Sequence, residues 1–344
     1  MAAFVDRHFR AVFVATLLAL LGLAWINRFV QDDAFIVFRY AQHLAAGIGP
    51  VFNPGERVEG YTCPLFMVLV AAAMHGGMDP VVAAQTIGFM ACLGSLLGAF
   101  ALARRLGCDR AQAWLAVVLL GTNYTFSAYA TGGLETQLQT ALATLSLVIG
   151  AGALTQPRPR AAALAAFSTF AGLAVLTRLD SALLVTPIAL VLLAHARGRS
   201  AALAALIVPG ALLVGAWLVW ESRYYGTLLP NTFHAKVGAH ASWARGLFYL
   251  FQFVTSYWLE AVLVLALWVW RDGLAGGRPA RVLLGTLALW LAYLVAIGGD
   301  FMEFRMLVPA LPIGAWFLAR AIAALEARAR LGGIVTALVL AGSL

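Results

Sequence analysis

Long apolar stretches occupy most of this 344-residue chain and limit the folds open to it more than any other feature. A helix of about 20 apolar residues crosses the hydrocarbon core of a bilayer. Only 11% of the residues are charged, against about 25% in soluble domains, so a soluble fold is excluded. The stretches predict ten spans, at residues 11–30, 81–103, 111–129, 135–154, 161–177, 181–196, 201–220, 246–270, 282–298 and 305–324.

Two further apolar stretches are too short to cross a bilayer by themselves. Residues 332–344 begin an eleventh span, so we expect that further spans or a soluble domain are absent from the C-terminus. Residues 64–74 predict a re-entrant or juxtamembrane helix, followed by a break at Gly76–Pro80. The sequence therefore predicts an all-α polytopic membrane protein of about 10–11 transmembrane helices, forming a single domain over residues 1–344.

The charged residues divide unequally between the two ends of these helices. With a cytoplasmic N-terminus, the cytoplasmic segments hold 15 of the 23 Lys and Arg residues but only four of the 15 Asp and Glu residues. This distribution follows the positive-inside rule and places the acidic loops outside the cytoplasm. It also explains the net charge of +8 without a nucleic-acid partner, because no basic cluster is interleaved with aromatic residues.

The first extracytoplasmic loop, residues 31–63, begins with the adjacent acids Asp32 and Asp33. The spacing predicts an amphipathic surface helix with Asp32, Arg39 and His43 on its polar face. Either aspartate would serve as a general base, because desolvation beside lipid raises the pKa of a carboxyl group. The alternative is an acid pair that only marks the N-terminus of a helix and interacts with its dipole.

A second polar loop, residues 221–245, combines cations with aromatic, amide and hydroxyl groups. Asn231 and His234 suit a sugar, whereas Arg223 and Lys236 suit a phosphate. An ordinary aromatic belt at the membrane interface would explain its rings equally, but would not need the amide or the imidazole.

Three smaller polar islands, which are short groups of polar residues between apolar stretches, lie on the predicted extracytoplasmic side. Gly298–Arg305 holds Asp300, Glu303 and Arg305 at the membrane surface, as a site or as a self-satisfied ion pair. Glu135 is interpreted either as a helix N-terminal acid or as a site residue. The sequence of residues 177–180 favours a self-paired turn.

No established metal or nucleotide motif accompanies these islands. Cys63, Cys92 and Cys108 match neither a disulfide framework nor a zinc site. No metal ligands are predicted and no cofactor is required, although two adjacent aspartates are compatible with a divalent cation.

Together the motifs resemble those of bacterial integral-membrane glycosyltransferases of the GT-C superfamily, and within it the arabinofuranosyltransferases of mycobacterial cell-wall arabinan and their proteobacterial relatives. The resemblance rests on the strings at residues 32–40, 49–62, 133–136, 225–232 and 299–305. It implies a polyprenyl-phosphate-linked sugar donor, a glycan or glycolipid acceptor in the cell envelope, and a periplasmic active site in the bacterial inner membrane. An aspartate of the first loop would be the base.

A mechanism consistent with these residues is inverting transfer. The carboxylate of Asp32 or Asp33 takes the proton of an acceptor hydroxyl, which attacks the anomeric carbon opposite the phosphate. Cations stabilise the leaving phosphate. The donor-binding candidates are Arg223, Lys236, His234, Asn231, Arg305, Arg39 and Arg57, and the supporting acids are Glu56, Glu59, Glu135, Asp300 and Glu303.

Two other functional classes remain open at this point. A lipid-linked sugar flippase would place charges near the middle of the membrane and often shows internal repeats, whereas here the charges gather at one face. A non-catalytic subunit of polysaccharide assembly is the third alternative.

Overall fold

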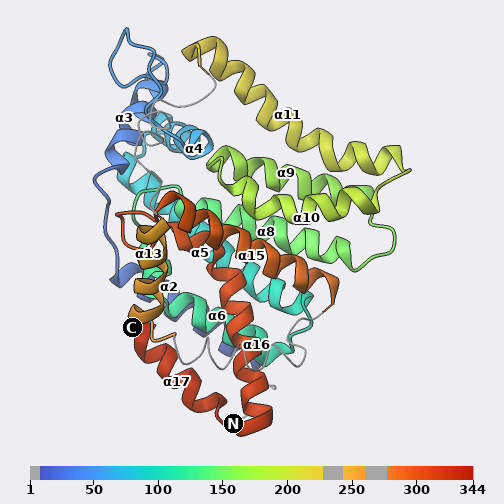
Figure 1. Ribbon diagram of the computed structural model, residues 1–344. Helices are drawn as coiled ribbons and strands as arrows, with labels where there is room; N and C mark the ends of the chain where they lie inside the picture. Colours follow the sequence, from blue (N-terminus) through green and yellow to red (C-terminus); the bar gives the residue numbers. More distant parts are fainter. Residues whose placement is uncertain (1–7, 228–242, 260–276, 344) are drawn as a thin grey trace.

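Every regular element in the described residues, 8–227, 243–259 and 277–343 of the computed structural model, is helical, which confirms the predicted all-α class (Figure 1). In chain order the elements are α2 (Phe9–Ile26), α3 (Ala34–Ala45), α4 (Pro64–His75), α5 (Pro80–Arg105), α6 (Arg110–Thr122), α7 (Tyr124–Ala128), α8 (Thr136–Leu154), α9 (Ala161–Thr177), α10 (Ser181–His195), α11 (Ser200–Tyr225), α13 (Trp243–Ser256), α15 (Arg278–Ile297), the 3₁₀ helix η1 (Arg305–Ala310), α16 (Leu311–Ala329) and α17 (Gly332–Ser343).

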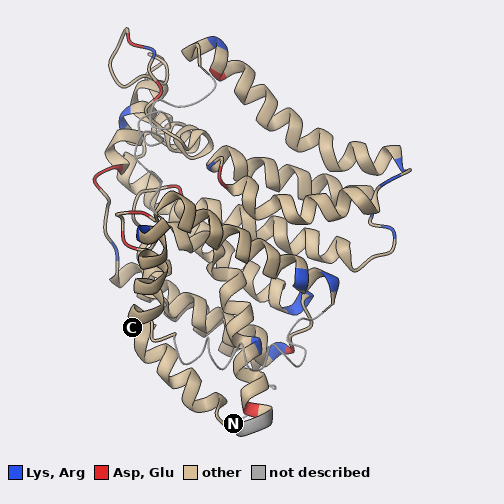
Figure 2. Ribbon diagram, viewed as in Figure 1, with Lys and Arg blue, Asp and Glu red and all other residues tan. Residues whose placement is uncertain are grey.

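Six stretches within the described residues are long and apolar enough to cross a membrane: α2, α5, α8, α11, α15 and Arg305–Ala327. Four shorter apolar helices, α4, α9, α10 and α17, accompany them. Acidic residues gather at the end of the molecule that carries α3, whereas the loops at the opposite end carry mostly Lys and Arg (Figure 2). The chain is therefore a multi-pass membrane protein with chemically different ends.

Several predicted spans differ in detail from the observed helices. The span 111–129 is divided into α6 and α7, because Asn123 adopts an extended conformation and its side chain caps the second helix at Phe126 N–H. The span 201–220 continues to Tyr225 and ends at Gly226, whose φ is 78°. Glu221 and Arg223 therefore lie on a helix rather than in a loop. The span 246–270 begins within α13, and its residues 260–270 lie outside the described ranges.

The short helix predicted after the first loop is confirmed as α4, which ends where Gly76 and Gly77 follow it. Helix α8 forms the centre of the molecule, packed against α5, α9, α10 and α15 (Figure 1). Small residues allow this close packing: a Cβ at Gly98 of α5 would lie 2.8 Å from Thr144 of α8. No hydrophobic driving force acts between helices that are surrounded by lipid, so close van der Waals contacts of this kind hold the helices together.

Helices α9 and α11 cross at a pair of glycines. A Cβ at Gly172 would lie 3.0 Å from the Cα of Gly210, and the N–H of Gly210 donates to the hydroxyl of Ser168 at 2.9 Å. Beyond this crossing α11 diverges from α9 towards the end that carries α3 (Figure 1). The crossing thus fixes the angle at which the outer end of α11 reaches the first loop.

Gly210→Ala should lower the thermal stability of the protein. The added Cβ would meet the carbonyl oxygen of Ser168 at 2.8 Å, and overpacking of this kind costs about 1–3 kcal/mol. Gly215→Ala is the matched control on the same helix, because its Cβ has no neighbour within 4 Å. We expect a lower unfolding midpoint in detergent for Gly210→Ala only; equal midpoints for the two variants would show that the crossing is loosely packed.

Candidate active site

The N-terminus of α3 carries the two aspartates of the first loop. Asp32 is exposed, and its Oδ1 accepts hydrogen bonds from Gln31 Nε2 and from the Asp33 N–H, both at 2.9 Å. Asp33 directly precedes α3 but makes no capping hydrogen bond, and none of the described residues donates to its carboxylate. Hydrogen-bonded capping therefore does not account for Asp33, whose oxygens stay available to a substrate.

The polar face predicted for this helix is only partly correct. Arg39 is exposed, and its Nε donates to the Phe52 carbonyl at 3.3 Å. His43 is only 6% exposed, with Nδ1 2.7 Å from the Val51 carbonyl, so its predicted place on the polar face is wrong. The loop folds back over α3 and takes up the imidazole, which periodicity alone does not reveal.

A second acidic island packs directly against this N-terminus. The Gln31 N–H donates to the Gly132 carbonyl at 2.9 Å. Gly133 has a φ of 76°, and a Cβ there would lie 3.1 Å from the Cβ of Ala34. The loop that leads into α8 is thereby fixed to the start of α3, and it carries Glu135 two residues further on.

Glu135 belongs to a buried cluster of three charges. Arg178 Nη1 donates to Glu135 Oε1 at 2.9 Å, and Arg178 Nη2 donates to Asp180 Oδ2 at 2.7 Å. The side chains of Glu135 and Asp180 are only 5% and 8% exposed. Gln139 and Ser181 complete the shell, since Gln139 Nε2 lies 2.9 Å from Asp180 Oδ1 and 3.0 Å from Ser181 Oγ.

The cluster clarifies two interpretations of the sequence. Glu135 makes no capping hydrogen bond to α8, so its carboxylate is not used as a helix cap. The turn at residues 177–180 does pair with itself, but Arg178 also reaches a partner 43 residues away. Burial raises the pKa of Glu135, and the opposing charges of Arg178 and Arg305 outweigh it, so that the pKa lies below its ordinary value.

The loop after α15 brings a second ion pair to the same region. Arg305 Nη2 lies 2.8 Å from Asp300 Oδ2, and both side chains are 11% exposed. Cys63 lies close enough to both ion pairs that Glu135, Arg178 and Arg305 all act on it electrostatically. Burial raises the pKa of its thiol. The ion-pair alternative for Asp300 and Arg305 is thus observed, although the pair lies beside Glu135 rather than apart from it.

Glu303 occupies a strained position in this loop, with a φ of 49°. Its Oε1 accepts a hydrogen bond from Thr125 Oγ1 at 2.7 Å, and Thr125 also contacts the Tyr257 hydroxyl. Burial raises the pKa of Glu303, and the Thr125 hydrogen bond only partly opposes this. Strain in non-glycine residues is concentrated at functional sites, which is consistent with a role for this loop.

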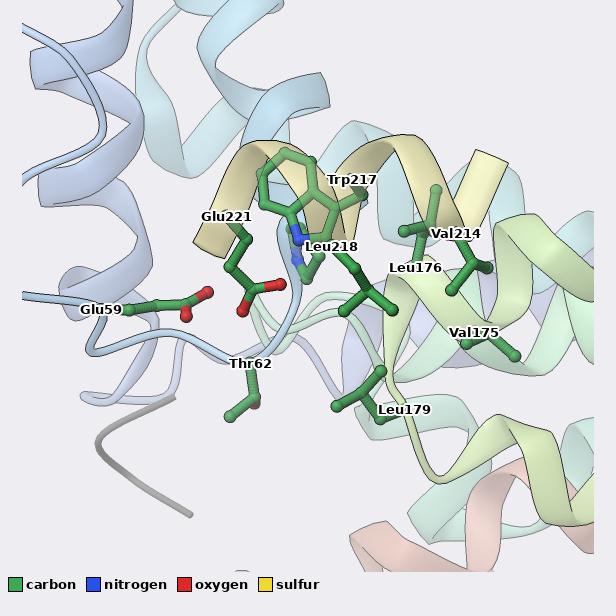
Figure 3. Close-up of a pocket in the computed structure, with 10 residues that line it drawn as sticks. Glu59, Thr62, Val175, Leu176, Leu179, Val214, Trp217, Leu218 and Glu221 are labelled. Carbon is green, nitrogen blue, oxygen red and sulfur yellow. The ribbon is translucent and has the colours of Figure 1, made fainter. Parts of the chain in front are cut away.

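The remaining predicted residues of the first loop lie around the outer end of α11. Glu56 is exposed and accepts a hydrogen bond from Asn53 at 3.1 Å. The Arg57 guanidinium lies 4.8 Å from the centre of the Tyr224 ring. Glu59 is buried and faces Glu221 (Figure 3). Arg223, two residues further along α11, is exposed.

Three predicted donor-binding residues, Asn231, His234 and Lys236, lie outside the described residues. Within the described ranges, no group of three or more His, Cys, Asp or Glu side chains is arranged to hold a metal ion. The structure therefore brings together Glu135, Asp300, Glu303 and Arg305, places Asp32 and Asp33 on the adjoining loop, and leaves Arg39, Arg57, Glu56 and Arg223 at the periphery.

Arg178 and Asp180 were not among the sequence candidates. Their one signal was a polar island between two apolar stretches on the predicted outer side, where a charge needs a partner. Because Asp180 lies only two residues from Arg178, the sequence already offered Arg178 a partner within the turn. The contact with the more distant Glu135 was therefore not predicted.

Residues 17–343 match the Alg9-like mannosyltransferase family. Similar proteins include the terminal β-(1→2)-arabinofuranosyltransferases of Corynebacterium glutamicum, 30% identical over 339 residues, and Mycobacterium tuberculosis, 30% identical over 324 residues. Each match covers 83% of this chain, and 46% and 51% of the respective relative. The chain thus spans about half the length of these relatives.

Solved structures with the same fold include ArnT from Cupriavidus metallidurans bound to undecaprenyl phosphate, with a TM-score of 0.66 and 16% identity, covering 92% of this chain and 60% of ArnT. The archaeal oligosaccharyltransferase AglB from Archaeoglobus fulgidus, in complex with an inhibitory peptide and a dolichol-phosphate, gives a TM-score of 0.57 at 12% identity over 95% of this chain and 52% of AglB. These similarities confirm the GT-C fold. The chain belongs to the Alg9-like mannosyltransferase family.

Proposed function

We propose that this protein transfers a monosaccharide from a polyprenyl-phosphate donor to a hydroxyl group of a cell-envelope glycan or glycolipid. Family membership supports glycosyl transfer. The solved structures of ArnT and AglB contain lipid phosphates, which supports a lipid-linked donor. The acidic end of the molecule is the proposed periplasmic face, because the opposite end carries most of the arginines (Figure 2).

The observation that carries this proposal is the junction between the first loop and the Glu135 loop. Asp33, whose carboxylate accepts no hydrogen bond from the described residues, starts the helix that packs against this loop. The loop carries Glu135, on which Arg178 and Arg305 both act, and these two arginines form the buried ion pairs. A base and stabilising charges on one face are what displacement at an anomeric carbon requires.

In the proposed reaction, an Asp carboxylate of the first loop accepts the proton of the acceptor hydroxyl. The acceptor oxygen bonds to the anomeric carbon while the bond from that carbon to the phosphate oxygen breaks, so the configuration inverts. The polyprenyl phosphate leaves with the bonding electrons. Arg178 hydrogen-bonds to two acids, Glu135 and Asp180. Arg305 pairs with Asp300 alone and Arg223 is exposed, so we assign these two arginines to the phosphate.

The purified protein in nanodiscs should transfer radiolabel from polyprenyl-phosphate sugars to an envelope glycan. Arabinose and mannose donors are compared, and free polyprenyl phosphate is measured with and without acceptor. Release that depends on acceptor supports the enzyme. Movement of labelled lipid across liposomes without any transfer would contradict the proposal and identify a flippase.

A further inference from the structure

A small cavity of about 20 Å³ lies where the first loop meets α9 and the outer part of α11 (Figure 3). Apolar side chains of α9 and α11 form most of its wall. Its polar lining consists of Glu59 and Thr62 from the first loop, and Trp217 and Glu221 from α11. The volume is close to that needed by a single water molecule, so the cavity is too small for a sugar.

Two carboxyl groups face each other across this cavity (Figure 3). Glu59 and Glu221 are only 3% and 4% exposed. Glu59 Oε2 is buried without a hydrogen-bond donor among the described residues, although the Glu221 carboxyl group is within interaction range. Two ionised carboxylates are both acceptors and repel each other, whereas a carboxyl group and a carboxylate share a strong hydrogen bond.

We infer that Glu59 and Glu221 bind one proton between them, and that this acid–acid hydrogen bond attaches the first loop to the outer end of α11. Loss of the proton leaves two buried negative charges in contact and weakens the attachment. This inference does not depend on the proposed transfer reaction, because it concerns the conformation of the loop in the absence of substrate.

The groups around Glu59 do not neutralise its charge. Burial, followed by the hydrogen bond and the charge of Glu221, raises the pKa of Glu59 to about 9. The phenols of Tyr40 from α3, Tyr61 from the loop and Tyr225 from α11 surround it. Among the described residues, every ionisable group that acts on Glu59 is thus an acid or a phenol, so a proton is its available counter-charge.

The other attachments between the loop and α11 are neutral or insensitive to pH in the same range. The Tyr225 hydroxyl donates to the Pro50 carbonyl at 2.6 Å, and it lies 3.1 Å from the Tyr61 hydroxyl. Arg57 stacks on Tyr224. On α3, the Tyr40 hydroxyl donates to the Val58 carbonyl at 2.8 Å. Among these contacts of the described residues, the acid pair is therefore the one that responds to pH.

The sign of the pH dependence follows from the raised pKa. The folded protein holds a proton on Glu59 that the unfolded chain releases near the ordinary pKa of glutamate. The stabilising contribution is therefore fully present below that ordinary pKa, and it is lost as the pH rises towards about 9.

Unfolding midpoints measured in detergent from about pH 6 to about pH 9.5 test the inference. The wild-type midpoint should fall by several degrees across this range. Glu59→Gln should show a flat profile, because the amide donates to Glu221 without titrating, and Glu221→Gln provides the same test from α11. Glu56→Gln is the matched control: this exposed acid in the same loop should leave the wild-type slope unchanged.

Cys63 supplies a second measurement, since this thiol is 2% exposed and lies between two residues that line the cavity. In a Cys92→Ala/Cys108→Ala background, its labelling by a thiosulfonate reagent is compared with and without Glu59→Gln at each pH, so that intrinsic thiol reactivity cancels. Cys63 should be labelled faster in the protein with Glu59 than in Glu59→Gln at the high pH, and at equal rates in the two proteins at the low pH.

Three results would overturn the inference. The first is a wild-type slope that persists in both Gln variants. The second is Cys63 labelling that is unaffected by Glu59→Gln at the high pH. The third is stabilisation of the wild type, but not of Glu59→Gln, by Mg²⁺ or Ca²⁺ at neutral pH, which would assign the pair to a metal ion instead of a proton.

Discussion

Replacing Asp33 with Asn should lower the rate of sugar transfer by about 10²- to 10⁴-fold, the usual contribution of a positioned general base. The substitution preserves the size and polarity of the side chain but removes the ability to take up a proton. Because none of the described residues donates to the Asp33 carboxylate, the fold loses no hydrogen bond. The measurement is the initial transfer rate, together with an unfolding midpoint that should stay unchanged.

Asp32→Asn is the matched control one residue earlier. Its amide oxygen can still accept the hydrogen bonds that Asp32 Oδ1 receives from Gln31 and from the Asp33 N–H. If Asp33 is the base, this variant retains much of its activity. A loss confined to Asp32→Asn would assign the base to Asp32, and full activity in both variants would remove the first loop from the chemistry.

Replacing Arg178 with Met should destabilise the protein by about 3–5 kcal/mol, as expected when a buried ion pair loses one partner. Glu135 and Asp180 would remain buried, at 5% and 8% exposure, without their cation. Arg178→Lys should restore only part of the stability, because a single ammonium cannot reproduce the bidentate contact with Asp180.

Arg39→Met is the control for this substitution. It removes an arginine that is exposed and holds one backbone carbonyl, so its unfolding midpoint should move little. The pH dependence offers a further test. The lowered pKa of Glu135 contributes stability that is lost as the pH falls. Without Arg178 the burial of Glu135 dominates and its pKa should rise, so the loss of stability at low pH should be smaller in Arg178→Met than in the wild type. Equal stability of the two Met variants would contradict a structural role for the cluster.

The bounds of the apolar membrane-spanning helices were the features that the sequence predicted most accurately. The span 161–177 coincides with α9 and the span 135–154 differs from α8 by one residue, because apolar length is set by membrane thickness. The break at Asn123 was missed because it rests on one side-chain cap within an unbroken apolar stretch. The bounds of the first surface helix were predictable, yet the burial of His43 depends on a loop that returns to it.

The partners of the charged residues were less accessible from the sequence. The pairing of Asp300 with Arg305 is local and was one of two stated alternatives. The contact of Arg178 with Glu135 joins the ends of two separate helices, and that of Glu59 with Glu221 joins the first loop to α11; neither leaves a spacing pattern in the chain. Such contacts are determined by how the helices pack, which composition and periodicity do not encode.

The close fit of Gly133 against Ala34 carries a wider consequence for genetics. Gly133 has no functional group, yet a methyl at this position would press on Ala34, Phe38 and Val30 from a backbone conformation that few other residues adopt. Inactivating substitutions should therefore not be confined to ionisable positions: a missense change at this chemically silent glycine should misalign both acidic loops at once.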